Sequence, residues 1–176
     1  MISFSKEVPN ANLRVISLGA GVQSSVLALM AAKGEITPMP DCAIFADTQY
    51  EPDDVYEHLE WLEERLPYPV YKVTIGNIKE HALKGVNKSG SKFVTMPFFT
   101  KSGIGMRQCT NDYKIQPIRT KTRELLGLKK GQRAKDVLCE TWIGISVDEI
   151  QRVKENKDKY IINRWPLLEL GMKRHH

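Results

Sequence analysis

Cysteine is scarce in this 176-residue chain, and its distribution argues against a disulfide framework. The three cysteines, Cys42, Cys109 and Cys139, are odd in number and widely spaced, and no Cys-x-x-Cys pair occurs. Reduced thiols are typical of cytosolic proteins, and this spacing predicts no zinc or iron–sulfur site within the chain itself. We therefore expect a reduced, cytoplasmic protein whose residues provide no metal site.

Long apolar runs are also missing. The longest, residues 26–32, is seven residues, whereas a membrane-spanning helix needs roughly 20. The first fourteen residues lack the apolar core of a signal peptide. We therefore expect a soluble protein that does not partner with a membrane.

Acidic residues are fewer than basic ones. The chain has 26 lysines and arginines and 21 aspartates and glutamates, which gives a net charge of +5. This balance favours anionic partners, either phosphorylated small molecules or nucleic acid, without choosing between them. Hydrophobic residues make up 41% and charged residues 27%, which is ordinary for a globular protein. The length predicts a single domain over residues 1–176.

Short apolar runs alternate with helical segments in the first half of the chain. Residues 13–18, 42–46 and 70–75 are predicted strands, and residues 26–33 and 53–66 are predicted helices between them. Such alternation indicates an α/β fold, a single doubly wound parallel sheet of about five strands with helices on both faces.

The second half continues the pattern after an interruption. Residues 87–110 have no clear periodicity and predict a long irregular loop. A helix is predicted over 115–126 and a strand over 137–145. Residues 146–149 match a capping box, which predicts a further helix. Residues 160–168 predict an edge strand that is interrupted by a proline.

Ligands of open parallel sheets bind beyond the carboxyl ends of the strands. The polar segment 19–25 follows the first predicted strand directly and precedes a helix. Its glycines permit close approach of a phosphate, Ser24 and Ser25 offer hydroxyl donors, and the helix offers unpaired N–H groups. The alternative is a plain tight turn, because a strand-to-helix turn needs glycine anyway. The segment matches neither a dinucleotide turn nor a Walker phosphate loop.

Four segments, SLGAGVQSS, IFADT, RQCTNDYKIQPIR and WIGISVDEIQR, together resemble the phosphoadenosine phosphosulfate (PAPS) reductase group. That group belongs to the N-type ATP pyrophosphatases, or PP-loop proteins, of the adenine nucleotide alpha-hydrolase-like (HUP) superfamily. The resemblance covers about residues 13–170. It implies a HUP-like fold that binds ATP or PAPS, with Mg²⁺ as a potential companion, for adenylation or sulfur-transfer chemistry.

The family's phosphate loop reads Ser-Gly-Gly-x-Asp-Ser-[Ser/Thr]. Gly21 and the two following serines match it, whereas Gly19, Ala20 and Gln23 depart from it. Gln23 can donate and accept hydrogen bonds but carries no charge, which puts any role of a carboxylate there in doubt. The implied residues of this loop are Leu18, Gly19, Gly21, Gln23, Ser24 and Ser25.

The remaining motifs imply further site residues. Those assigned to nucleotide binding are Asp47, Thr48, Gly144 and Arg152. Those assigned to catalysis are Arg107, Lys114 and Asp148, where the two cations would pair with phosphate or sulfate oxygens. Alternatives stay open: Asp47 also suits a turn or a helix N-cap, the cations also suit a solvated surface, and Arg152 also suits a surface ion pair with Asp148.

The nucleophilic cysteine of PAPS reductases lies in a C-terminal Glu-Cys-Gly-Leu-His segment, which this sequence lacks. The resemblance therefore gives little support to thioredoxin-linked reduction of PAPS, and we expect the C-terminal part of the family to be missing here. Cys109 is either a partly buried thiol or an orphaned ligand. Iron–sulfur or zinc binding is expected only with a C-terminal extension.

Two alternatives accompany the nucleotide-dependent enzyme. A component that modifies DNA or tRNA with sulfur would bind nucleic acid, and the basic cluster Lys129, Lys130, Arg133 and Lys135 suits such a partner. A catalytically silent nucleotide-binding subunit would explain Gln23. The oligomeric state is not determined by the sequence, and a homodimer stays open.

Overall fold

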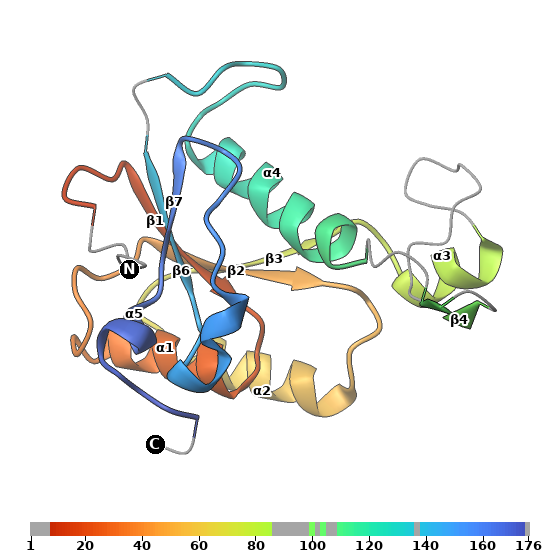
Figure 1. The fold of residues 1–176 in the computed structure, drawn as a ribbon, viewed down its shortest axis with the longest axis horizontal. Coiled ribbons are helices and arrows are strands. Elements are labelled where there is room, and N and C mark those ends of the chain that lie inside the picture. The colour runs from red at the N-terminus through yellow and green to blue at the C-terminus, as the bar shows by residue number, and fades with distance from the viewer. Residues whose placement is uncertain (1–7, 86–98, 101–102, 105–108, 136–137, 175–176) are drawn as a thin grey trace.

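The computed structural model describes residues 8–85, 99–100, 103–104, 109–135 and 138–174. Its centre is a five-stranded parallel sheet in the order β3-β2-β1-β6-β7 (Figure 1). The strands are β1 (Leu13–Leu18), β2 (Cys42–Asp47), β3 (Val70–Thr74), β6 (Cys139–Ile143) and β7 (Ile161–Arg164). The predicted α/β fold with a parallel five-stranded sheet is confirmed.

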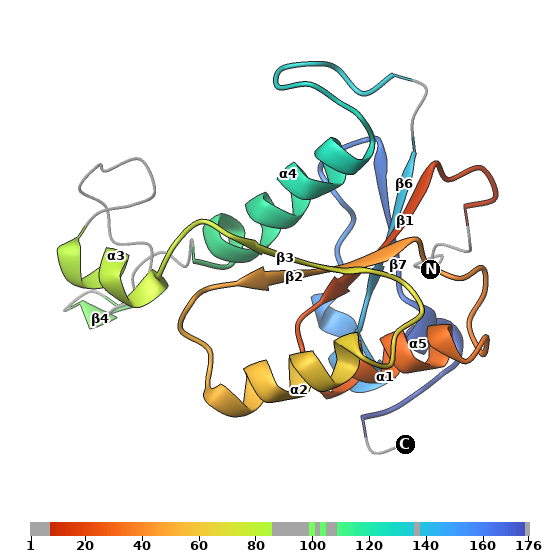
Figure 2. The ribbon, with the colours of Figure 1, turned by 180° about the vertical axis from the view of Figure 1, so that it is seen from behind.

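Helices cover both faces of this sheet, as predicted. α1 (Val22–Ala32), α2 (Asp53–Glu63) and the short α5 (Pro166–Glu169) lie on one face, and α4 (Gln116–Leu125) lies on the other (Figures 1 and 2). None of the helices in the described ranges has the length and apolar character needed to cross a membrane.

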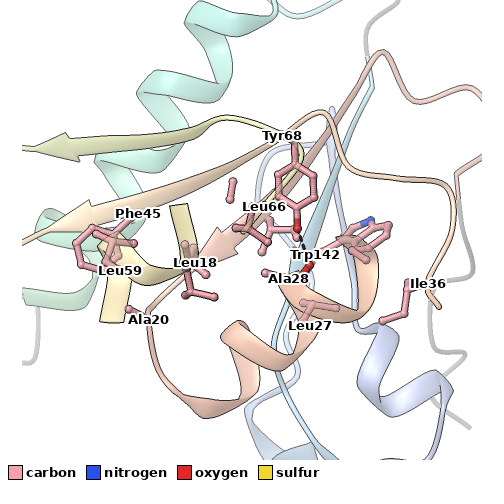
Figure 3. Close-up of a cluster of buried hydrophobic side chains, with 14 of the residues drawn as sticks. Leu18, Ala20, Leu27, Ala28, Ile36, Phe45, Leu59, Leu66, Tyr68 and Trp142 are labelled. Atoms are coloured by element: carbon pink, nitrogen blue, oxygen red, sulfur yellow. Dashed lines mark hydrogen bonds between the residues drawn. The ribbon is translucent and has the colours of Figure 1, made fainter. Parts of the chain in front are cut away.

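The two faces follow from side-chain alternation along the strands. Ile16 and Leu18 of β1 belong to the cluster under α1 and α2, which also contains Trp142 (Figure 3). Leu13 and Val15 of the same strand belong to a second cluster, against which Ile118, Leu125 and Leu126 of the α4 region pack. Because β1 and β2 are apolar on both faces, each must lie inside the sheet, as a doubly wound fold requires.

The strand registers align the carboxyl ends at one edge of the sheet. Leu18 pairs with Phe45 of β2, and Ser17 pairs with Ile143 of β6. The chain leaves β1 for β2 on one side and reaches β6 on the other. The order of the strands therefore reverses beside β1, and such a point leaves a crevice between the connecting loops.

Glycine and proline residues explain where two of the helices end and begin. Gly34 adopts a positive φ of 76°, and the N–H groups of Gly34 and Glu35 donate to the carbonyls of Ala31 and Met30. This is a Schellman motif, and it ends the helix next to residue 33, where the predicted first helix also ends. α4 begins as predicted, with Pro117 in its first turn. It is preceded by a π-helical turn, Asn111–Ile115, which the sequence analysis does not anticipate.

Two predicted elements differ from the structure. The expected strand over 160–168 ends at Arg164, because Pro166 begins α5 instead of interrupting an edge strand. The expected capping box gives only a 3₁₀ segment, Val147–Arg152, and Ser146 makes no side-chain cap there. Its hydroxyl accepts a hydrogen bond from Gln23 at 2.7 Å instead, so tertiary contact replaces the local cap.

Most of the loop predicted over 87–110 lies outside the described residues. Within it, β4 (Phe99–Thr100) pairs with β5 (Gly103–Ile104) as a short antiparallel hairpin. The preceding helix α3 (Ile78–Lys84) is capped by Asn77, whose side chain accepts from the Glu80 N–H at 3.0 Å. α3 lies away from the two layers of helices, beyond the end of β3 (Figures 1 and 2).

A buried charge cluster joins β6 to β7. Glu140 is fully buried and accepts from the indole N–H of Trp142 at 2.5 Å and from the Val8 N–H at 2.5 Å. Arg164 lies 3.5 Å from Glu140 and donates to Glu169 at 3.0 Å. Hydrogen bonding to Glu169 and the charges of both glutamates raise the pKa of Arg164, against the opposing effect of its burial. A buried carboxylate survives here because its oxygens are hydrogen-bonded.

Candidate functional site

A pocket of about 390 Å³ lies at the carboxyl edge of the sheet, where the strand order reverses. The ends of β1, β2 and β6 form its floor, through Leu18, Phe45 and Ile143. The start of α1 and the 3₁₀ segment 147–152 form its walls. This is the position at which open parallel sheets bind their ligands, and the volume suits a small organic molecule.

The loop from β1 to α1 is shaped by one strained residue and one serine. Ala20 adopts a positive φ of 51°, in the left-handed region that costs a residue with a Cβ about 1–2 kcal/mol. The Ser24 hydroxyl accepts from the Gly19 N–H at 3.2 Å and donates to the Gly21 carbonyl at 3.0 Å. The Ser24 side chain therefore holds the turn in shape, and its proton is already directed at Gly21.

The N-terminus of α1 is open toward the pocket. Gly21 is its N-cap, no side chain caps it, and its first turn contains no acidic residue. The Ser25 N–H makes the first intrahelical bond, to the Gly21 carbonyl at 3.0 Å. The N–H groups of Val22, Gln23 and Ser24 precede that bond and have no acceptor within the helix. These donors and the helix dipole together favour an anion at this position.

Gly144 lets β6 lie directly against this first turn. A Cβ built on Gly144 would lie 2.8 Å from the Ser24 nitrogen and 2.9 Å from the Gln23 carbonyl carbon. Real Cβ atoms do not approach backbone so closely, so only glycine fits without a shift of α1. The glycine of the WIGIS segment therefore has a steric role in closing one side of the pocket.

Three cations and one carboxylate line the pocket. Lys114, Arg152 and Arg174 supply the positive charge, and Glu149 supplies the negative charge. Arg152 donates to Glu149 at 2.6 Å, and Lys114 lies 3.5 Å from the Glu51 carboxylate. The described lining is thus cationic, and it faces the N-terminus of α1, which is also positive.

The residues assigned to nucleotide binding and catalysis fall into three groups in the structure. Those that line the pocket are Leu18, Gly19, Gly21, Gln23, Ser24, Lys114, Gly144 and Arg152. Those that are described but do not line it are Ser25, Asp47, Thr48 and Asp148. Arg107 lies outside the described residues.

The four described residues beyond the pocket have structural partners. The Ser25 hydroxyl lies 2.9 Å from Nε2 of His58 on α2. Asp47 accepts hydrogen bonds from the Gln49 N–H at 2.7 Å and from the Tyr56 hydroxyl at 2.8 Å. Desolvation raises the pKa of Tyr56, and its hydrogen bond to Asp47 raises it further. Thr48 donates to Glu51 at 2.9 Å.

Asp148 accepts from the Arg174 backbone N–H at 2.7 Å. Arg152 pairs with Glu149, three residues before it, whereas the alternative assignment of Arg152 to a surface ion pair had Asp148 as the partner. Glu149 also lines the pocket beside Arg152.

Mg²⁺ does not fit the described lining as a protein-bound ion. This cation prefers several oxygen ligands, and the single carboxylate in the described lining, Glu149, is already paired with Arg152. Gln23, at the position where the family pattern has aspartate, donates its amide to Ser146. A magnesium ion would have to be held mainly by the phosphates that accompany it.

The cysteines differ in their surroundings. Burial raises the pKa of the Cys42 thiol to about 12 and that of the Cys139 thiol to about 11, with smaller contributions from Asp41 and Glu140. Cys109 is partly buried. The described residues contain no cluster of three metal-binding side chains. Within the described part of the chain, Cys109 therefore does not belong to a cluster of metal-binding side chains.

Several lining residues were missed by sequence reasoning. Phe45 and Ile118 supply apolar surface, and Phe45 lies one residue before the end of the predicted second strand, so its position could have been anticipated. Glu149 follows Asp148 in a segment already recognised. Arg174 carries no signal in the sequence, because only the reversal of the chain after α5 brings it to the pocket.

The fold is similar to that of phosphoadenylyl-sulfate (PAPS) reductase from Candida auris, whose crystal structure is a phosphate complex. The two structures superpose with a TM-score of 0.51 at 15% sequence identity, over 91% of this chain. The chain spans 66% of the length of that enzyme. No protein-family model and no curated protein matches the sequence. The likeness shows a PAPS reductase-like α/β fold.

Proposed function

We propose that the chain binds an adenine nucleotide in this pocket, with its phosphates on the N-terminus of α1, as part of a PAPS reductase-like or ATP-pyrophosphatase-like enzyme. The observation that carries the proposal is the uncapped N-terminus of an eleven-residue helix that opens into a pocket lined by three cations. The similarity in fold to a PAPS reductase supports the same assignment.

The pocket has a polar side and an apolar side, an arrangement that suits a nucleotide. The N–H groups of Val22, Gln23 and Ser24, with Arg152 and Lys114, supply donors for phosphate oxygens. A planar base would lie on the apolar part of the lining, which consists of Leu18, Phe45, Ala46, Ile118 and Ile143. A phosphate and a heterocycle would thus each contact the chemically matching side of one pocket.

The chemistry that this binding would serve is displacement at phosphorus or sulfur. Cations and helix N–H groups around the phosphates stabilise the negative charge that develops on the leaving group. Arg152, Lys114 and Arg174 line the pocket and are the candidates for this role. Adenylation of an acceptor and sulfur transfer both require this stabilisation, so the pocket is compatible with either.

Calorimetric titration of the full chain tests the proposal. ATP and PAPS should bind, whereas adenosine, which has no phosphate, should bind much more weakly. Arg152→Ala should weaken ATP binding about tenfold through loss of a charge-assisted hydrogen bond. Arg133→Ala removes an equal charge from an exposed position outside the pocket and serves as the control. Absence of heat with every phosphate-bearing compound would refute the proposal.

Nucleic acid is the second candidate, because a basic surface lies at the opposite end of the sheet. Lys129, Lys130, Arg133 and Lys135 are exposed on the loop that leads into the amino end of β6. The loop is held by Arg123, which donates to the carbonyls of Lys129 and Gln132. Binding to DNA or RNA should fall steeply with salt, and alanine at these four positions should lower the slope.

Turnover distinguishes an active enzyme from a silent nucleotide-binding subunit. Gln23 lacks the charge of the aspartate in the family pattern, and its amide is engaged by Ser146. Gln23→Asp would restore the carboxylate, and Gln23→Asn is the uncharged control of equal size. A gain in ATP turnover with Mg²⁺ for the aspartate variant alone would favour an enzyme in which this charge matters; equal, negligible turnover in all forms would favour the silent subunit.

A further inference from the structure

The segment after α5 returns to the pocket by a defined turn. Gly171 adopts a positive φ of 65°. The N–H groups of Gly171 and Met172 donate to the carbonyls of Leu168 and Leu167, at 3.0 Å and 2.9 Å. This is a second Schellman motif, and Met172 packs against the core cluster that includes Leu167. The direction of the chain after residue 171 is therefore fixed by the fold.

Two hydrogen bonds then attach the segment 172–174 to the wall of the pocket. The Val147 N–H donates to the Met172 carbonyl at 2.9 Å. Two residues later, the Arg174 N–H donates to the Asp148 carboxylate at 2.7 Å. The second bond has a charged acceptor, and such bonds are shorter and stronger than neutral ones. Asp148 thus fixes the backbone of Arg174 beside the pocket that Arg174 lines.

We propose that Arg174 is an anion-binding residue of the nucleotide pocket and that Asp148 is a positioning residue that acts through it. The inference rests on the proposed function, because it assigns roles within the same pocket. Asp148 does not line the pocket in the described structure, whereas Arg174 does. The carboxylate therefore serves binding by ordering a cationic segment through the Arg174 backbone N–H.

The physical advantage is entropic. A segment that is free in solution loses backbone freedom when a ligand binds it, and that loss is subtracted from the affinity. With Asp148 in place, the Arg174 backbone is held before the ligand arrives. Removal of Asp148 should therefore weaken binding only while Arg174 is present to be positioned.

A double-mutant cycle on the full chain tests this with ATP and adenosine as the probes, by calorimetry at low salt. Arg174→Ala should weaken ATP binding about tenfold and leave adenosine unchanged, and Arg174→Lys should recover part of the loss. Asp148→Ala should weaken ATP binding about threefold, with Asp148→Asn closer to wild type. The double variant Asp148→Ala/Arg174→Ala should bind ATP no more weakly than Arg174→Ala alone. Arg133→Ala is the charge-matched control, and circular dichroism confirms that each variant is folded.

The outcomes separate the two proposals. If wild type binds ATP and Arg174→Ala binds it equally well, the role of Arg174 is refuted while the proposed function stands. If the effects of Asp148→Ala and Arg174→Ala are additive, Asp148 does not act through Arg174, and the positioning role is refuted. If the wild-type chain binds neither ATP nor PAPS, the proposed function fails and this inference fails with it.

Discussion

Gly144, the residue directly after β6, lies against the backbone of Ser24 in the first turn of α1, so closely that a Cβ would be 2.8 Å from the Ser24 nitrogen. The contact joins two segments 120 residues apart, and both line the same pocket. The position of the helix N-terminus, and hence of its N–H donors, depends on this approach.

Gly144→Ala should therefore damage stability and binding together. The methyl group would push α1 away from β6 and cost about 1–3 kcal/mol of unfolding free energy, as overpacking usually does. Nucleotide affinity should fall as well, because the helix N–H groups move. Chemical denaturation and calorimetry measure the two effects. Gly21→Ala is the control: a Cβ there meets nothing within 4 Å, so its unfolding free energy should fall only by the poorer capping of alanine, about 0.5–1 kcal/mol. Equal stability of the two variants would contradict the steric role of Gly144.

Glu149→Gln should strengthen phosphate binding. Glu149 is the single carboxylate in the described lining, and it accepts a hydrogen bond from the guanidinium of Arg152 at 2.6 Å. Its neutralisation removes repulsion of the ligand and releases Arg152, which we expect to raise ATP affinity about three- to tenfold, or about 0.7–1.4 kcal/mol. Titration of ATP at low and high salt measures the change, which should shrink as salt increases. Glu155→Gln, an exposed change outside the pocket, should have no effect. A weaker affinity for the Glu149 variant would show that this carboxylate serves binding directly.

Arg164→Ala should be among the most destabilising single substitutions in this protein. Arg164 lies beside the fully buried Glu140 and also contacts Glu169, so its removal leaves a buried carboxylate without its cation. Breaking such a pair typically costs about 3–5 kcal/mol. Arg119→Ala breaks a partly exposed pair with Asp158 and should cost about 1 kcal/mol or less. Urea denaturation compares the two variants, and similar losses would refute the argument from burial.

Alkaline pH should destabilise the fold through the buried thiols. Because burial raises the pKa of Cys42 to about 12 and that of Cys139 to about 11, both thiols stay neutral in the folded state where they would ionise in the unfolded chain. Stability from this source is fully present below about pH 9 and is lost as pH rises from there, toward about 11 for Cys139 and about 12 for Cys42, by up to about 1.4 kcal/mol per unit and thiol.

Urea denaturation at pH 8, 9 and 10 measures this loss, which Cys42→Ala should reduce. Iodoacetamide supplies an independent test at pH 8: Cys42 and Cys139 should react only after unfolding, whereas Cys109 is partly exposed and should react in the native state. Rapid labelling of Cys42 in the native state would contradict its burial in the fold.

The sequence predicted the architecture because its signals are local or periodic. The branched apolar runs at 13–18 and 42–46 are hydrophobic on both faces, which places them inside a parallel sheet whatever the remaining contacts. Gly34 ends α1 where a left-handed residue is needed. The loop after the first strand lies at the pocket because the carboxyl ends of parallel strands share one edge.

Other features depended on contacts between distant segments, which no local pattern encodes. The local sequence predicts Ser146 as a helix cap. In the structure its hydroxyl instead accepts a 2.7 Å hydrogen bond from the side-chain amide of Gln23, which is 123 residues away in the sequence. The resemblance implies a catalytic role for Asp148, and the structure adds a hydrogen bond from the Arg174 backbone N–H that no local pattern encodes. The sequence alone thus determined the layers, the order of elements and the edge at which a ligand would bind. Only the tertiary structure decided which charges line that edge, because side chains at a pocket are selected by the path of loops and returning segments, and not by periodicity.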